Sequence, residues 1–151
     1  MTRWADDVHP NQTTEYPRPE LSRGADSWTS LNGLWEVDAS VASIDSPPFG
    51  HTLSGHILVP YPIESPLSGI RNLTASGYMF YRRVLEPGSI SCPARTLLHF
   101  EAVDWQEKIW CNGDLLGSHS GGYDPFTFEL TACFAAAKGN PTELIVGVFD
   151  P

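Results

Sequence analysis

The feature that most constrains the fold is a series of short β-type runs, each ended by glycine, proline or an Asn-Gly pair. The runs are rich in aromatic and β-branched residues, which favour strands over helices when the runs are this short. In the second half of the chain they lie at 78–85, 95–101, 106–111, 115–119, 126–130 and 143–149. Together with earlier runs at 31–38 and 56–60, they predict an all-β sandwich.

Two local signals refine this expectation. Asn112-Gly113 separates two apolar runs and predicts a tight hairpin, because a type I′ turn needs two residues with positive φ. Residues 131–138 favour about two turns of helix, with Thr131 as the N-cap and Gly139 closing the last turn. We therefore expect at most one short helix beside the strands.

The distribution of proline and glycine predicts the domain organisation. Residues 1–27 have little apolar periodicity and several prolines, so they predict an extended N-terminal arm. Residues 28–151 form the predicted sandwich domain, a size that can bury a core of its own. Segments 43–54 and 61–77 are rich in proline, glycine and polar residues and are predicted as loops.

The three cysteines and the N-terminus bear on the compartment. Cys92, Cys111 and Cys133 are an odd number without a C-x-x-C spacing, which argues against a zinc finger and a disulfide scaffold. We expect reduced thiols that are buried or half-buried. The first residues are polar and acidic, with no apolar segment of a signal peptide, so we expect a cytoplasmic protein.

The balance of charge excludes several partners. The chain has 18 Asp and Glu against nine Lys and Arg, for a net charge of -9. An acidic chain without a basic cluster is poorly suited to a phosphate backbone or an anionic lipid surface. No apolar run is long enough to cross a bilayer. We therefore expect neither nucleic acid nor a membrane as a partner.

The sequence contains none of the common catalytic or cofactor motifs. His51, His56 and His99 lack the spacing of metal ligands. Glu101 and Asp104 lie close together at the end of a strand, but nothing indicates that they face each other across a pocket. We predict no catalytic residue, no metal site and no cofactor in these 151 residues.

Segment 99–131 concentrates aromatic residues, glycines and acids. Sugar binding uses this combination, because aromatic rings stack on the apolar face of a sugar and carboxylates accept hydrogen bonds from its hydroxyls. The same composition also suits an ordinary sandwich core with glycine turns. Both interpretations stay open.

A set of short motifs occurs in the order of one known domain type. The motifs are Leu31-Asn-Gly-Leu-Trp35, Val59-Pro60, Tyr81-Arg-Arg83, Leu98–Trp105, Cys111-Asn-Gly113, Gly117-Ser-His-Ser-Gly-Gly-Tyr123, Pro125-Phe126, Leu130-Thr131 and Val148-Phe-Asp-Pro151. In this order they resemble the N-terminal sugar-binding domain of family 2 glycoside hydrolases, which includes β-galactosidases, β-glucuronidases and β-mannosidases. The resemblance covers about residues 28–151.

The resemblance implies a jelly-roll β-sandwich, similar to galactose-binding domains, and a part in the hydrolysis of terminal β-glycosides by a longer enzyme. In that family both catalytic glutamates lie on a (β/α)₈ barrel, for which 151 residues are too short. We therefore expect a fragment without the catalytic barrel, inactive by itself. The alternative is a free-standing carbohydrate-binding or interaction module.

The resemblance also implies two residues that contact a carbohydrate partner. Asp150 matches the family's acidic residue at the end of the last strand, which can contact sugar or a bound ion. The loop after Val59-Pro60 often supplies a second contact, an Asn at the position that Pro62 occupies here, so we take Glu64 as its substitute. Arg82 and Arg83 alternate along a strand, and we expect the inward one to pair with a core acid.

Overall fold

The computed structural model describes residues 5–10, 27–71, 77–90 and 95–151. Most of the predicted N-terminal arm, 1–27, lies outside the described residues, and so does Cys92. The chain divides into two compact units, of which unit 1 is Met1–Trp35 with Gly55–Thr74 and unit 2 is Glu36–Ser54 with Ala75–Pro151. In the part of the chain that the structure describes, no helix is long and apolar enough to cross a membrane.

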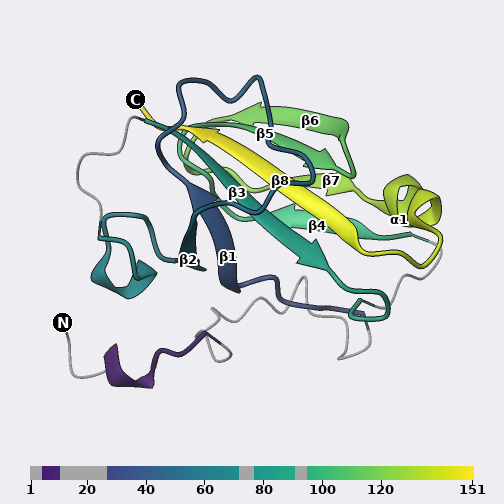
Figure 1. The fold of residues 1–151 in the computed structure, drawn as a ribbon, viewed down its shortest axis with the longest axis horizontal. Coiled ribbons are helices and arrows are strands. Elements are labelled where there is room, and N and C mark those ends of the chain that lie inside the picture. Colours follow the sequence, from purple (N-terminus) through teal and green to yellow (C-terminus); the bar gives the residue numbers. More distant parts are fainter. Residues whose placement is uncertain (1–4, 11–26, 72–76, 91–94) are drawn as a thin grey trace. The chain divides into compact units, whose positions relative to one another are not determined.

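Strands dominate the described residues, which confirms the all-β prediction (Figure 1). The strands are β1 (Gly33–Asp38), β2 (Gly55–Val59), β3 (Tyr78–Leu85), β4 (Leu97–Phe100), β5 (Gln106–Cys111), β6 (Asp114–Ser120), β7 (Phe126–Glu129) and β8 (Thr142–Phe149). The helical elements are α1 (Thr131–Ala137) and two 3-10 turns, η1 (Ala5–Asp7) and η2 (Pro66–Ser68). Each predicted run therefore contains a strand.

Unit 2 is built on a large antiparallel sheet in the order β1-β3-β8-β5-β6. Strand β1 crosses the boundary between the units, and its residues Glu36 to Asp38 pair with β3. In unit 1, β2 is the neighbour of β1. The predicted hairpin joins β5 to β6, and Asn112 (φ 49°) and Gly113 (φ 95°) both have the positive φ that its turn requires.

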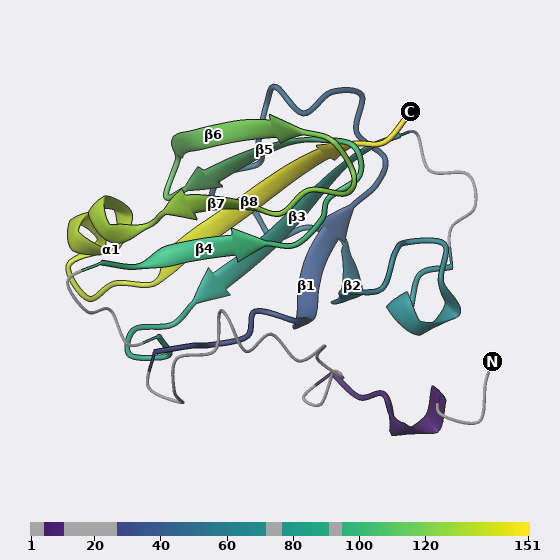
Figure 2. The same cartoon turned by 180° about the vertical axis from the view of Figure 1, so that it is seen from behind.

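Strands β4 and β7 form a second, two-stranded sheet on one face of the large sheet (Figures 1 and 2). The ring of His119 on β6 stacks on Phe126 of β7, with 4.2 Å between ring centroids. A Cβ added at Gly117 would lie 2.5 Å from the ring of Phe128. Glycine at this position in β6 therefore lets the second sheet approach closely, which makes the fold a sandwich.

The opposite face of the large sheet is covered by the loop that follows β1, residues 39–54 (Figures 1 and 2). A buried apolar cluster joins the loop to the sheet, and it consists of Ile44, Leu53, Phe80, Trp110 and Ile145. A Cβ added at Gly147 would lie 2.8 Å from the Phe80 ring and 3.0 Å from Ile44. The segment predicted as a loop is therefore the second cover of the sheet.

An ionic network on this face holds the covering loop. Arg82 donates from Nη1 to Glu36 at 2.9 Å and from Nε to Glu143 at 2.5 Å. The two carboxylates accept the backbone N–H groups of Leu53 (2.9 Å) and Gly50 (3.1 Å). Burial opposes the charge of Arg82, but the hydrogen bonds to Glu143 and Glu36 outweigh it and raise the pKa of Arg82. The expected pairing of an arginine with acids therefore holds for Arg82.

The prediction of free thiols is wrong for two of the cysteines. Cys111, at the end of β5, forms a disulfide with Cys133 of α1, with 6.2 Å between their Cα atoms. This pairing could not be predicted from the sequence, because 22 residues separate the two cysteines and only the fold brings α1 beside the end of β5. The odd count of three cysteines pointed away from any disulfide.

The predicted helix forms as α1, but its ends differ from the prediction. The N-cap is Leu130, which makes no side-chain capping bond. The hydroxyl of Thr131 instead accepts the backbone N–H of Thr96 at 3.0 Å, so it ties the helix to the segment before β4. At the other end, Lys138 (φ 50°) already takes the left-handed conformation, one residue before the predicted glycine.

Candidate functional site

Asp150, the first of the two predicted site residues, follows directly on β8. Its backbone N–H donates to the carbonyl oxygen of Gly77 at 2.7 Å. Gly77 has φ 80°, and a Cβ added there would lie 2.6 Å from the carbonyl oxygen of Asp150. Only glycine allows the two backbones to come this close, so Asp150 is half-buried on a fixed main chain.

Two further segments join Asp150 at this end of unit 2. The N–H of Trp105 donates to the carbonyl of Phe149 at 3.1 Å, and the N–H of Gly121 donates to the carbonyl of Trp105 at 2.7 Å. The ring of Tyr78 stacks on Phe149, with 4.5 Å between centroids. We call the surface formed by Gly77, Asp104–Trp105, Gly121–Asp124 and Phe149–Asp150 the β8-end surface.

The β8-end surface exposes two aromatic side chains beside carboxylates. Trp105 is 44% exposed and Tyr123 is 93% exposed. Asp104 and Asp124, their neighbours in sequence, are also exposed. A Cβ added at Gly122 would lie 2.5 Å from Oδ1 of Asp104, so the turn that carries Tyr123 packs tightly on Asp104. Part of segment 99–131 therefore carries its aromatics and acids outward rather than into the core.

Glu64, the second predicted site residue, belongs to unit 1 and is exposed. It lies between Ile63, which is 3% exposed, and Ser65, the N-cap of η2. The Ser65 hydroxyl accepts the N–H of Leu67 at 3.2 Å, and the Ser68 hydroxyl donates to the Ser65 carbonyl at 2.8 Å. Glu64 is therefore carried on an ordered turn, whereas Asp150 belongs to unit 2.

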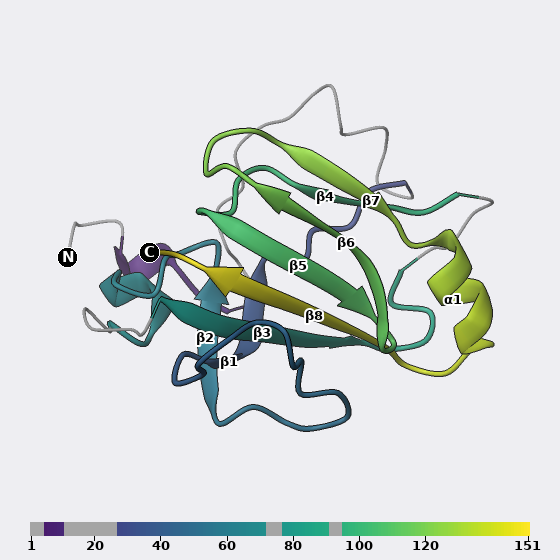
Figure 3. The same ribbon diagram turned by 90° about the horizontal axis from the view of Figure 1, so that it is seen from above.

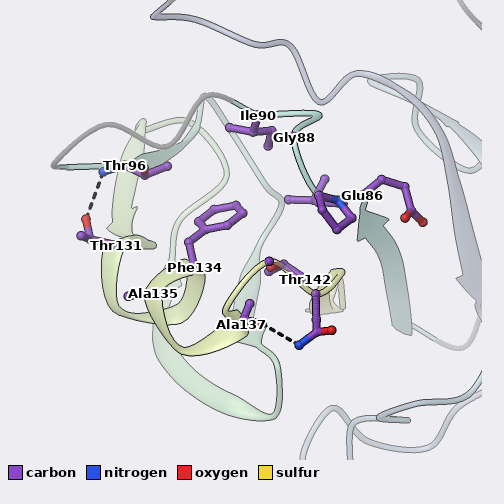
Figure 4. A pocket seen from close by; sticks show the side chains of 13 residues that line it. Glu86, Gly88, Ile90, Thr96, Thr131, Phe134, Ala135, Ala137 and Thr142 are labelled. Carbon is purple, nitrogen blue, oxygen red and sulfur yellow. Dashed lines mark hydrogen bonds between the residues drawn. The ribbon is translucent and has the colours of Figure 1, made fainter.

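The described residues also form a cavity of about 510 Å³ in unit 2. It lies between α1 and the turn after β3, with Phe134 on one side and Ile90 on the other (Figure 4). Thr142, the first residue of β8, is part of its lining, whereas Asp150 follows the last residue of that strand. Figure 3 shows α1 beside the start of β8 and the C-terminus of the chain at the other end of the strand. Glu86 is the only carboxylate in the lining, and neither predicted site residue is there.

A buried acidic residue, Glu107, is the functional group that the sequence analysis missed. Its side chain is fully buried, and Oε1 lies 2.8 Å from Nδ1 of His119. Burial raises the pKa of Glu107 to about 7, although the charge of His119 and a hydrogen bond with it act in the opposite direction. The signal was present, because Glu107 alternates in phase with the buried Ile109 on β5.

The remaining candidates do not form a reactive cluster. Among the described residues, no group of three or more His, Cys, Asp or Glu could hold a metal ion. His51 and His56 are exposed, and Nδ1 of His99 lies 2.8 Å from the hydroxyl of Thr127. What the arrangement offers chemically is a fixed backbone that presents aromatic rings and carboxylates to a ligand.

Comparison with known proteins points to one family. The family described as "Glycosyl hydrolases family 2, sugar binding domain" matches residues 51–150 of this chain. The match begins before β2 and runs through β8 to Asp150, so it includes every segment of the β8-end surface.

The similar proteins are much longer than this chain. A β-galactosidase of Thermoanaerobacter pseudethanolicus is 43% identical over 37 residues, 24% of this chain and 5% of its own length. A β-glucuronidase of Streptococcus agalactiae is 35% identical over 57 residues, 38% of this chain and 10% of its own length. The structure of Faecalibacterium prausnitzii β-glucuronidase shares 26% identity and a TM-score of 0.61, over 89% of this chain and 22% of that protein. The chain thus spans about a fifth or less of each relative.

Proposed function

The chain belongs to the family of glycosyl hydrolase family 2 sugar binding domains, and on that premise we propose that it forms one wall of a carbohydrate site that serves the hydrolysis of a terminal β-glycoside. The observation that carries the proposal is the family match, which runs from before β2 through β8 and ends at Asp150. In this proposal the sugar-splitting carboxylates belong to parts of the longer relatives that have no counterpart in these 151 residues.

We assign the main sugar contact to Asp150. Its backbone is fixed against Gly77, so the point from which the carboxylate extends is set before a ligand arrives. A carboxylate accepts hydrogen bonds only, and two hydroxyl groups of one sugar ring can donate to it. Glu64, in unit 1, is a separate and weaker candidate for a sugar contact, because it is exposed and offers the same chemistry.

Binding of simple glycosides to the 151-residue chain tests the two contacts. Saturation-transfer NMR should detect weak binding of methyl β-glycosides, because a single wall buries little of a sugar. Asp150→Asn should weaken binding, and Glu64→Gln should weaken it less, whereas Asp114→Asn in the exposed hairpin turn is the matched control. Equal binding by Asp150→Asn and the control would remove Asp150 from the site.

Turnover assays test the proposed location of catalysis. The chain should not hydrolyse chromogenic β-galactosides or β-glucuronides above the rate of a Glu101→Gln, Asp104→Asn double variant. Hydrolysis clearly faster than that variant would place the reaction in this chain. Tight calorimetric binding of a sugar without turnover would instead favour a free-standing carbohydrate-binding module.

A further inference from the structure

The β8-end surface exposes large aromatic side chains, which protein surfaces usually avoid. Large aromatic side chains are costly to expose, yet Trp105 and Tyr123 lie on two segments that are hydrogen-bonded to each other through Gly121. The other large apolar residues exposed among the described residues are leucines, namely Leu34, Leu97 and Leu115. Among the described residues, the large aromatic side chains that are exposed therefore lie on this surface, next to its exposed carboxylates.

The surrounding backbone is fixed independently of the two aromatic side chains. Trp105 is held through its main-chain N–H and carbonyl, and the turn before Tyr123 is held by Gly121 and by the close approach of Gly122 to Asp104. Because these constraints act on the backbone, the exposed rings are not needed to hold the turn. A role in contact with another molecule explains their exposure better than a role in packing.

The charge of the surface restricts the kind of molecule. The segments that form it contain Asp104, Asp124 and Asp150 but no lysine or arginine. Carboxylates attract ligands that donate hydrogen bonds and repel ligands with a negative charge. A neutral pyranose fits both parts of the surface, because it offers an apolar ring face to an aromatic side chain and hydroxyl donors to an acid.

We propose that the β8-end surface binds a neutral sugar ring by stacking on Trp105 or Tyr123, and that it discriminates against uronic acids. This inference rests on the proposed function and specifies the class of sugar. It runs against the simplest expectation from the comparisons, in which β-glucuronidases are prominent. The carboxylates of the surface repel the carboxylate of a uronic acid, and this repulsion supplies the specificity.

Two matched pairs of ligands test the proposal on the 151-residue chain. Methyl β-glucoside and methyl β-glucuronide differ only at C6, and so do methyl β-galactoside and methyl β-galacturonide. Saturation-transfer NMR titrations should show at least one neutral glycoside binding about fivefold more tightly than its uronide partner. Asp124→Asn should reduce that ratio, because it removes one negative charge without changing the shape of the surface.

Aromatic truncations test the stacking surface separately. Trp105→Ala or Tyr123→Ala should weaken binding of the neutral sugar roughly two- to tenfold. Leu115→Ala is the control, because Leu115 is also an exposed apolar residue (57%) but lies beside the β5–β6 hairpin. Circular dichroism and thermal unfolding of each variant confirm that the fold is intact.

The outcomes separate this inference from the proposed function. Sugar binding that is unchanged in both aromatic variants, or uronides that bind as tightly as their neutral partners, would overturn the inference and leave the carbohydrate role in place. Absence of binding for all four glycosides at millimolar concentration would overturn both.

Discussion

Glu107 gives the sharpest prediction about this domain, because its environment is unfavourable to its charge. The side chain is fully buried on β5, and His119 is the ionisable group that contacts it. Oε2 of Glu107 has no hydrogen-bond partner among the described residues. Glu107→Gln replaces the carboxyl with a neutral amide of nearly the same size, so it removes the titration and keeps the volume of the side chain.

The size and sign of the effect follow from the pKa. Burial raises the pKa of Glu107 from 4.5 to about 7, so the folded state holds the proton more tightly than the unfolded state does. The contribution of this group to stability is therefore complete below pH 4.5 and is lost as the pH rises to about 7. At about 1.4 kcal/mol for each pH unit, the loss amounts to about 3 kcal/mol. Glu107→Gln should abolish this loss.

Urea unfolding followed by tryptophan fluorescence between pH 4.5 and pH 8 measures the effect. The free energy of unfolding of Glu107→Gln should exceed that of the wild type by about 3 kcal/mol at pH 8, and the gap should close toward pH 4.5. Glu86→Gln, a change at an exposed glutamate, is the control and should follow the wild type. A wild type and a Glu107→Gln variant with the same pH dependence would refute the reasoning.

Three other substitutions test the contacts that hold unit 2. Cys111→Ser should lower the free energy of unfolding by about 2–4 kcal/mol, because it removes the disulfide with Cys133. In denaturation series with and without dithiothreitol, the reductant should lower the stability of the wild type only. Arg82→Met should cost about 2–3 kcal/mol in urea unfolding, because it leaves Glu36 and Glu143 without their shared cation; a smaller loss in 1 M salt would show that solvent already screens the network. Gly147→Ala should lower stability by about 1–3 kcal/mol in thermal unfolding, because the new methyl group meets the Phe80 ring; an unchanged melting temperature would mean that the ring can move aside.

The disulfide also bears on the compartment. Disulfides persist in oxidising compartments and are rare in the cytosol. Titration of thiols on protein isolated from its source without reductant therefore tests the cytoplasmic expectation. Three reactive thiols in the unfolded chain would support the expectation, whereas one thiol would favour an oxidising compartment.

The strands could be predicted because local chemistry determines them. Proline and glycine end the runs, and Asn112 and Gly113 readily adopt the positive φ that the hairpin turn requires. What could not be predicted depends on contacts between distant segments. The Cys111–Cys133 disulfide needs α1 to dock beside β5, and the Thr131 hydroxyl, expected to cap the helix, accepts the N–H of Thr96 from a distant segment. Sequence patterns describe neighbours along the chain, and these pairings arise only in the folded sandwich.

For the candidate site, too, one part could be predicted from the sequence and another part could not. Asp150 was predicted from a motif, and its fixed backbone depends on Gly77, more than 70 residues earlier in the chain. The sequence analysis noted the aromatic residues of segment 99–131, but the choice between core and surface depended on the register of β5 and β6. That register buries Glu107 and Ile109 and leaves Trp105 outside, just before the strand begins.

The two ends of β8 differ in how they are held, and this difference favours the β8-end surface as the place where specificity can change. Near Thr142, the disulfide, the hydroxyl of Thr131 and the packing of Phe134 add side-chain contacts to the backbone hydrogen bond from Asn112 to Glu143. Near Asp150, backbone hydrogen bonds and glycines without room for a Cβ hold the segments together, beside the stacked rings of Tyr78 and Phe149. None of these backbone contacts uses the side chains of Trp105, Tyr123 or Asp124, so we expect their substitution to cost little stability. Substitutions at residues 105, 123 and 124 should therefore report on binding rather than on folding.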